Sequence, residues 1–210
     1  MFDKKNPKKA GKWTILFLFS ALIIWLMPVL AGEPEGGDTP QAVFEAAQKA
    51  GANKDLGALA KLVAPSERAM LAFGTDMGVG MFIEFYEGEK APELKKKYQE
   101  IQQKYEIKTE TEENEEPLQI TSETPQEVID AHMRERAKKL YGHVDVVSYV
   151  PELMAIMFSM PEMADQPVFP HKELSDLKID GDQATGTADD KELKFIREDG
   201  RWYLTADIMD

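Results

Sequence analysis

The spacing of apolar positions divides the chain into a helical first part and a strand-rich last part. Between Thr39 and Gly51, the apolar residues Val43, Phe44 and Ala47 recur at the spacing of one helix face. Thr39 is suited to be the N-cap of this helix, and the proline that follows it is suited to the first helical position. This pattern predicts a first helix that begins immediately after Thr39.

Two further helix starts follow closely. Asp55 can cap a short helix, and Pro65 with Ser66 begins a third one. The third helix is predicted to continue through residues 74–90, "GTDMGVGMFIEFYEGEK". That stretch is rich in glycine but lacks the Gly-Lys-Ser/Thr ending of a phosphate-binding loop, so we interpret it as helix.

Residues 91–108 predict an exposed amphipathic helix. Leu94, Tyr98, Ile101 and Tyr105 form a narrow apolar seam, and charged residues occupy many of the other positions. We expect this seam to pack either on the body of the protein or on a partner.

The helical region is interrupted at residues 109–123, which are acidic and poor in bulky apolar residues and therefore predict a solvated loop. Helical spacing resumes after this loop. Thr124 as N-cap and Glu127 three residues later match a capping box, and Gly142 is expected to end the helix.

The last quarter of the chain alternates apolar and polar residues, which predicts strands. Asp180-Gly181, Asp189-Asp190 and Asp199-Gly200 separate the alternating runs, and Asp-Gly between such runs is a strong hairpin signal. Leu193 and Phe195 are expected to share a face with Trp202 and Leu204. The fold class is therefore predicted to be α+β, with N-terminal helices packed on a C-terminal antiparallel four-stranded meander. The four predicted strands cover about 174–179, 182–188, 191–197 and 201–207.

The N-terminus differs in kind from the rest. A lysine-rich start is followed by an uncharged apolar run over 14–31, which ends in a small-residue site and predicts a signal peptide at 1–31. The alternative is an uncleaved membrane anchor, since the run reaches the minimum length for a span. Residues 32–38 then form a linker, and residues 39–210 form the domain. Either interpretation places the domain outside the cytoplasm, as a periplasmic, secreted or inner-membrane-anchored protein.

Charge and cysteine content narrow the function classes. Removing 1–31 would leave 20 basic and 37 acidic residues and change the formal net charge from -13 to -17. Such a chain is repelled by phosphate backbones and anionic lipids, so we expect no nucleic-acid partner and no membrane contact beyond residues 14–31. The chain has no cysteine, which excludes disulfides and a lipid-modified cysteine.

Two stretches resemble a known superfamily. Residues 39–68, "TPQAVFEAAQKAGANKDLGALAKLVAPSER", are similar to the first helices of nuclear transport factor 2-like (cystatin-like) proteins. Residues 179–208, "IDGDQATGTADDKELKFIREDGRWYLTADI", look like the terminal hairpins of the same superfamily, and the chain resembles its uncharacterised exported bacterial members. The resemblance implies a curved sheet wrapped against helices around a cone-shaped cavity. Residues 75–170 depart from the family pattern and are interpreted as a helical insertion.

The candidate chemistry is sparse. His132, His143 and His171 have no spacing that forms a metal triad or a nucleophile and base pair. We therefore predict no catalytic residue, no metal and no cofactor. The alternative is a cone-cavity enzyme of the superfamily that uses His132 or a buried carboxylate.

Methionines recur in "MAIMFSMPEM", residues 154–163, and spaced thioethers can bind Cu(I). Each step of three residues turns a helix by about 300°, so only neighbours such as Met154 and Met157 share a side. Pro161 is expected to end the helix near Met160 and to leave Met163 in a loop. Three interpretations of these methionines remain. We prefer a packed core, followed by the lining of a cavity and then by a soft-metal site.

These patterns together predict an exported, non-enzymatic binding or interaction domain. Its ligand would be a small apolar molecule or an envelope protein partner. The expected pocket-lining residues are Tyr149, Met157, Phe158 and Trp202. An interaction protein that recruits its partner through the seam of residues 94–105 is a further alternative.

Overall fold

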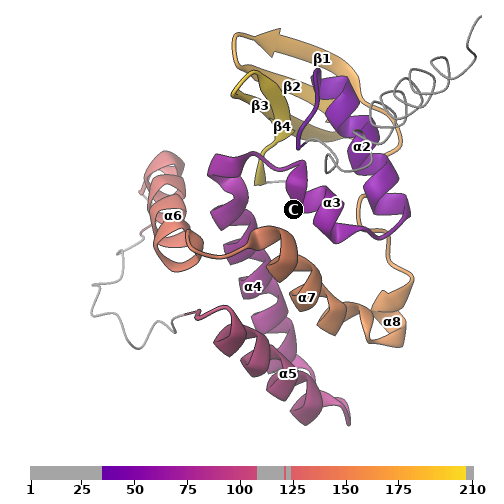
Figure 1. Ribbon diagram of the computed structural model, residues 1–210, viewed down its shortest axis with the longest axis vertical. Helices are drawn as coiled ribbons and strands as arrows, with labels where there is room; N and C mark the ends of the chain where they lie inside the picture. The colour runs from indigo at the N-terminus through magenta and orange to yellow at the C-terminus, as the bar shows by residue number, and fades with distance from the viewer. Residues whose placement is uncertain (1–34, 108–120, 122–123, 207–210) are drawn as a thin grey trace, which may run out of the picture. The chain divides into compact units, whose positions relative to one another are not determined.

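A computed structural model describes residues 35–107, 121 and 124–206. The predicted signal segment 1–31 and the acidic loop, apart from Thr121, lie outside the described residues. Residues 36–210 form a unit of their own. The elements of this unit are α2 (Pro40–Ala52), α3 (Leu56–Lys61), the short 3-10 helix η2 (Pro65–Glu67), α4 (Arg68–Phe85), α5 (Ala91–Lys104), α6 (Gln126–Tyr141), α7 (Val146–Phe158), α8 (Pro161–Ala164), β1 (Ser175–Asp180), β2 (Gln183–Ala188), β3 (Lys191–Glu198) and β4 (Arg201–Leu204) (Figure 1).

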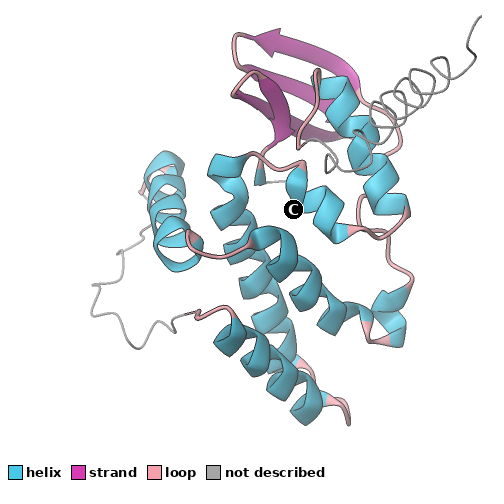
Figure 2. Ribbon diagram, in the orientation of Figure 1, coloured by secondary structure: helices cyan, strands magenta, loops and turns pink. Residues whose placement is uncertain are grey.

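The predicted fold class is confirmed, since the described part is α+β with its helices before its strands. Figure 2 shows the strands together at one end, with helices making up the remainder. The four strands form one antiparallel sheet in the order β1-β2-β3-β4. The turn residues Asp189, Asp190, Asp199 and Gly200 all have positive φ, which the tight hairpin turns require.

The first two helices begin where the sequence predicts. The Thr39 side chain accepts a hydrogen bond from the backbone N–H of Ala42 at 3.1 Å. The Asp55 carboxylate accepts from the N–H of Ala58 at 2.8 Å. Each side chain satisfies one of the helix N–H groups that have no partner within the helix.

The predicted capping box at Thr124 is wrong. Helix α6 begins at Gln126 with Pro125 as its extended N-cap, and no side chain caps it. The Thr124 hydroxyl instead accepts from the backbone N–H of Thr121 at 3.0 Å. A residue that precedes proline is disfavoured in helical conformation, and here Thr124 closes a turn with the residues before the helix.

The sheet is attached to the helices through β4. Trp202 exchanges two backbone hydrogen bonds of 2.8 Å with Gly37, and the backbone of Leu204 bonds to Leu62 and Ala64 on either side of Val63. These contacts cover the outer edge of β4. The predicted shared face of the sheet is confirmed, because Leu193, Phe195, Trp202 and Leu204 are all buried.

Helix α4 is the centre of the helical part and packs against α5, α6 and α7 (Figure 1). The predicted seam of α5 packs on the body of the protein. Leu94 is 1% exposed, and Tyr98, Ile101 and Tyr105 are partly buried against the core. Tyr105 also donates a hydrogen bond of 3.0 Å to Glu152 of α7. The seam is therefore largely used within this chain.

Candidate functional site

A pocket of about 770 Å³ lies between α4, α5 and α6. Much of its wall is apolar, with contributions from Phe73, Met77, Ile83, Met133 and Leu140. Polar side chains reach it from α5 and from the middle of α4. A concave, largely apolar volume of this size with a few convergent polar groups has the general form of a small-molecule site.

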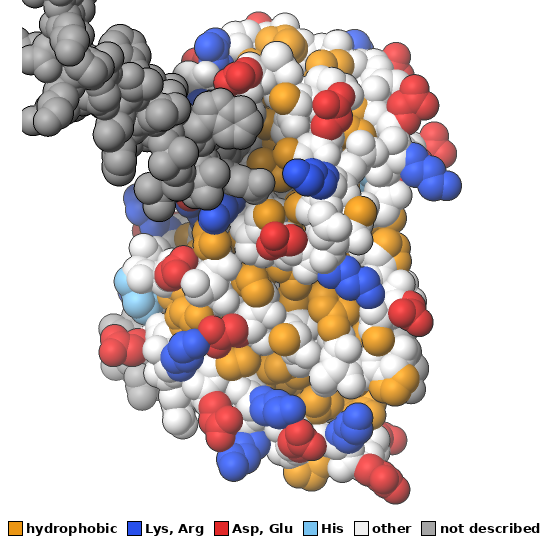
Figure 3. Space-filling view, turned by 45° about the vertical axis from the view of Figure 1, so that its right-hand side comes forward, with side chains coloured by type: hydrophobic (Ala, Val, Ile, Leu, Met, Phe, Trp, Pro, Cys, Tyr) orange, Lys and Arg blue, Asp and Glu red, His pale blue; other side chains and the backbone are white. Residues whose placement is uncertain are grey.

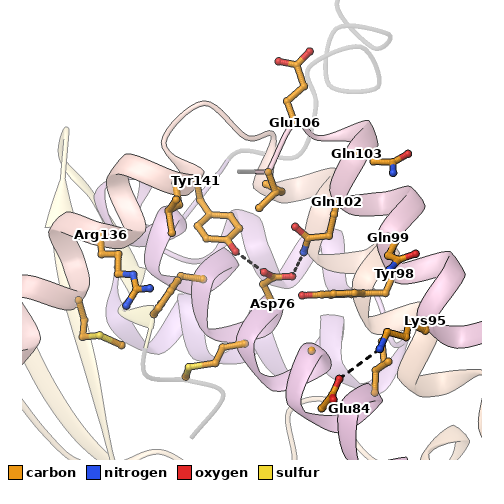
Figure 4. Close-up of a pocket in the computed structure, with 17 residues that line it drawn as sticks. Asp76, Glu84, Lys95, Tyr98, Gln99, Gln102, Gln103, Glu106, Arg136 and Tyr141 are labelled. Atoms are coloured by element: carbon orange, nitrogen blue, oxygen red, sulfur yellow. Dashed lines mark hydrogen bonds and ion pairs between the residues drawn. The ribbon is translucent and has the colours of Figure 1, made fainter. Parts of the chain in front are cut away.

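The carboxylate of Asp76, which is 8% exposed, is the central polar group of this pocket. Its Oδ2 accepts a hydrogen bond from the Tyr141 hydroxyl at 2.5 Å. Its Oδ1 accepts from the Tyr149 hydroxyl at 2.9 Å and from the Gln102 amide. Figure 4 shows Tyr141 and Gln102 converging on Asp76 from opposite sides. Through these bonds one residue of α4 is joined to α5, α6 and α7.

The helical spacing of α4 explains why Asp76 faces inward. Ala72, Val79 and Ile83 lie on the same face at spacings of three and four residues, and all three are buried. Gly80, one turn after Asp76, has no side chain to obstruct the approach of α5. A Cβ at Gly80 would lie 2.9 Å from the Tyr98 hydroxyl, so the glycine provides room for that ring.

The tyrosine hydroxyls around Asp76 are held in their protonated form. Burial raises the pKa of Tyr141 and Tyr149 above the ordinary tyrosine value, and the negative charge of Asp76 raises the pKa of both further. The pKa of Tyr98 is raised for the same two reasons. The three groups therefore stay neutral at physiological pH.

The cationic residues that line the pocket have partners of their own. The Lys95 ammonium lies 3.7 Å from the Glu84 carboxylate, and both side chains are exposed (Figure 4). The guanidinium of Arg136 lies 6.0 Å from the centre of the Phe73 ring. Asp76 differs from Lys95, which lies beside an opposite charge, because the hydrogen-bond donors to Asp76 among the described residues are all neutral.

The four residues expected to line a pocket lie on two elements, three on α7 and one on β4. Tyr149 is fully buried and donates to Asp76. Met157 and Phe158 lie at the C-terminal end of α7, and the Lys54 ammonium lies 6.0 Å from the centre of the Phe158 ring. Trp202 is buried in β4. The pocket between α4, α5 and α6 is lined by none of these four.

The methionine segment packs on the hydrophobic core. Helix α7 ends at Phe158, slightly before the predicted position, and Met160 is extended and buried. Met163 lies in the short helix α8 rather than in the predicted loop, and Met154, Met157 and Met163 pack partly buried against the core. Figure 3 shows apolar side chains among charged ones on one face, at the height where Figure 1 places α5, α7 and α8.

The histidines lie apart from one another in the fold. His132 is partly exposed on α6, and His143 contacts the backbone oxygen of Tyr105 at 3.2 Å. His171 is buried, with its Nδ1 3.5 Å from an oxygen of Asp189. Within the described ranges, no cluster of three or more His, Asp or Glu side chains is arranged to hold a metal ion.

Asp76 and its partners Gln102 and Tyr141 are not among the residues expected to form a site. One signal in the sequence does point to Asp76: it is the single charged residue of α4 between Arg68 and Glu84. A lone charge within an apolar helix faces the core and needs hydrogen-bond partners there.

Within the part of the chain that the structure describes, no helix has the length and apolar character needed to span a membrane. No family model, no curated protein and no solved structure matches the chain.

Proposed function

We propose that this chain is an exported, non-enzymatic binding domain that takes up a small, largely apolar molecule between α4, α5 and α6. The observation that carries this proposal is the pocket of about 770 Å³ with the Asp76 carboxylate in its wall. Small-molecule sites are typically clefts of roughly 300–1,000 Å³ with apolar walls and a few polar groups. The lysine-rich, apolar N-terminal sequence supports export.

The hydrogen bonds of Asp76 support a binding role because they connect the pocket walls. Tyr141 lies on α6, Gln102 on α5 and Tyr149 on α7, and all three donate to one carboxylate on α4. Walls that are held in place before the ligand arrives lose less conformational entropy on binding. The pocket is therefore suited to a ligand of defined shape.

The relation to nuclear transport factor 2-like proteins is part of the same proposal. The residues that carry the resemblance form α2, α3 and the strands β2 to β4, in the order that the superfamily would require. A small-molecule ligand is favoured over a partner that binds the seam of α5, because Leu94 and its neighbours in that seam already pack within the chain.

A second candidate, an acid–base enzyme, is favoured by the presence of a buried carboxylate beside an open pocket. The oxygens of Asp76 already accept from Tyr141, Tyr149 and Gln102. A general base needs an acceptor position directed at the proton of the substrate. His132, the other candidate base, does not line the pocket. Binding is therefore the better supported function.

The proposal is tested by isothermal titration of the full chain, held in phosphatidylcholine nanodiscs, with phenethyl alcohol as a neutral apolar probe. We expect a dissociation constant on the order of 1 mM, given the few heavy atoms of the probe. Met133→Trp, which fills the pocket from α6, should abolish binding. Val128→Trp is the matched control, because Val128 lies on the same helix, is exposed and does not line the pocket. Equal heats from both variants and from empty nanodiscs would refute the proposed function.

A further inference from the structure

The Asp76 carboxylate is buried without a cation. Charged side chains are seldom fully buried unless an opposite charge accompanies them. The donors to Asp76, namely Tyr141, Tyr149 and Gln102, are all neutral among the described residues. This carboxylate therefore lies beside an open pocket, and no positive side chain of the described residues donates to it.

The groups that hydrogen-bond to Asp76 among the described residues are all neutral. A carboxylate offers roughly four acceptor positions. Oδ1 accepts from Tyr149 and Gln102, and Oδ2 accepts from Tyr141. The Tyr98 hydroxyl also hydrogen-bonds to this carboxylate. These four neutral donors match the four positions, so a cation in the pocket is attracted by the carboxylate as a charge and does not fill a vacant acceptor position.

The charge balance of the pocket also favours a cation. Its lining includes the carboxylates of Asp76, Glu84 and Glu106 against the cations Lys95 and Arg136. Lys95 already pairs with Glu84, and Arg136 lies over the Phe73 ring. The whole chain carries a formal net charge of -13, which adds a field that attracts cations.

The surroundings of Asp76 suit an organic cation better than a metal ion. Calcium takes six to eight oxygen ligands, whereas the groups nearest to this carboxylate are hydrogen-bond donors. Most of the pocket wall is formed by apolar and aromatic side chains, including Phe73, Tyr98 and Tyr141. Aromatic rings attract cations through their faces, so these walls are compatible with a charged amine on an apolar body.

We propose, on the basis of the proposed function, that the pocket selects a molecule that carries a protonated amine on an apolar body. The ammonium group lies beside the Asp76 carboxylate and supplies the positive charge that none of the donors to this carboxylate carries. The apolar body lies against the side chains of Phe73, Met77 and Met133.

Three probes with the same phenylethyl skeleton test this selectivity: phenethylamine, phenethyl alcohol and hydrocinnamate. Each is titrated into the full chain in nanodiscs at about 0.15 M salt, where attraction to distant surface charges is largely screened. We expect phenethylamine to bind about tenfold more tightly than the alcohol, and hydrocinnamate to bind more weakly than both. Met133→Trp should abolish the binding of phenethylamine as well.

Asp76→Asn should remove the preference, so that phenethylamine and phenethyl alcohol bind within about twofold of each other. Glu84→Gln is the matched control, because it removes the same charge from an exposed residue at the pocket. The preference for phenethylamine should survive in this control. If Asp76→Asn does not fold, the selectivity is judged from the dissociation constants of the three probes on the unmodified chain.

The outcomes separate the two proposals. Binding of phenethyl alcohol as tightly as phenethylamine, or a preference lost equally in Glu84→Gln and Asp76→Asn, overturns this inference and leaves the proposed function standing. Absence of binding for all three probes overturns both.

Discussion

The hydrogen bond between Asp76 and Tyr149 predicts a large energetic coupling between these two residues. Asp76→Ala removes three hydrogen bonds to an ionised acceptor, each worth about 1.5–3 kcal/mol. It also removes the cost of burying a carboxylate, which is itself several kcal/mol. Because the two terms oppose each other, we expect a net loss of about 2–4 kcal/mol in the free energy of unfolding.

Tyr149→Phe alone should cost about 1.5–3 kcal/mol, because the hydroxyl of this fully buried residue donates to the Asp76 carboxylate. In the Asp76→Ala background the same change should cost much less, since the hydroxyl has lost its acceptor and keeps only the hydrogen bond that it accepts from the Gln102 amide at 3.2 Å. The expected coupling energy is therefore about 1.5–3 kcal/mol.

The four proteins of this cycle are compared by urea unfolding of the full chain, followed by circular dichroism. The control cycle replaces Tyr149→Phe with Tyr203→Phe, a tyrosine that is also buried but lies in β4, away from the network. In the control cycle, the changes in the free energy of unfolding caused by Asp76→Ala and Tyr203→Phe should add within about 0.5 kcal/mol. A coupling between Asp76 and Tyr149 as small as that of the control pair would refute the reasoning.

Two further predictions concern alkaline pH and two glycines. Because folding raises the pKa of Tyr141 and Tyr149 above 10.0, the unfolded chain loses these protons first. The contribution of these two tyrosines to stability should be constant below about pH 10 and fall above it by up to about 1.4 kcal/mol per pH unit for each tyrosine, measured by urea unfolding beside the ultraviolet absorbance of tyrosinate. Gly78→Ala, in open space on α4, should stabilise by about 0.5–1 kcal/mol. Gly51→Ala should destabilise by about 1–3 kcal/mol in the same assay, because its Cβ would lie 2.6 Å from that of Phe169.

The features that the sequence predicts well are those determined by neighbouring residues. The caps at Thr39 and Asp55 each join residues three positions apart. The hairpins depend on turn residues with positive φ, such as Asp199 and Gly200. The cap at Thr124 fails for an equally local reason: the proline that follows can serve either as the first helical residue or as the N-cap, and the Thr-Pro pair alone does not distinguish the two.

The candidate site depends on contacts that local patterns do not determine. Asp76 lies 26 residues from Gln102, 65 from Tyr141 and 73 from Tyr149. The apolar spacing of each helix tells which face turns inward, but not which inward side chain meets which. Tyr149 illustrates this limit, because its inward position follows from the pattern of α7 while its partner follows from the packing of α4, α5, α6 and α7 together.

The position of the pocket follows from which side chains separate the helices. Where the sheet meets the helices, bulky apolar residues such as Phe195 and Leu204 are almost completely buried, so that interface is closely packed. Between α4, α5 and α6, the polar side chains of Asp76, Gln102 and Tyr141 bridge the helices through hydrogen bonds. Hydrogen-bonded side chains must keep their donor and acceptor geometry, so they cannot rearrange freely to fill the remaining space. A lone aspartate in an apolar helix therefore indicates both a polar network and the region where a cavity is most readily retained.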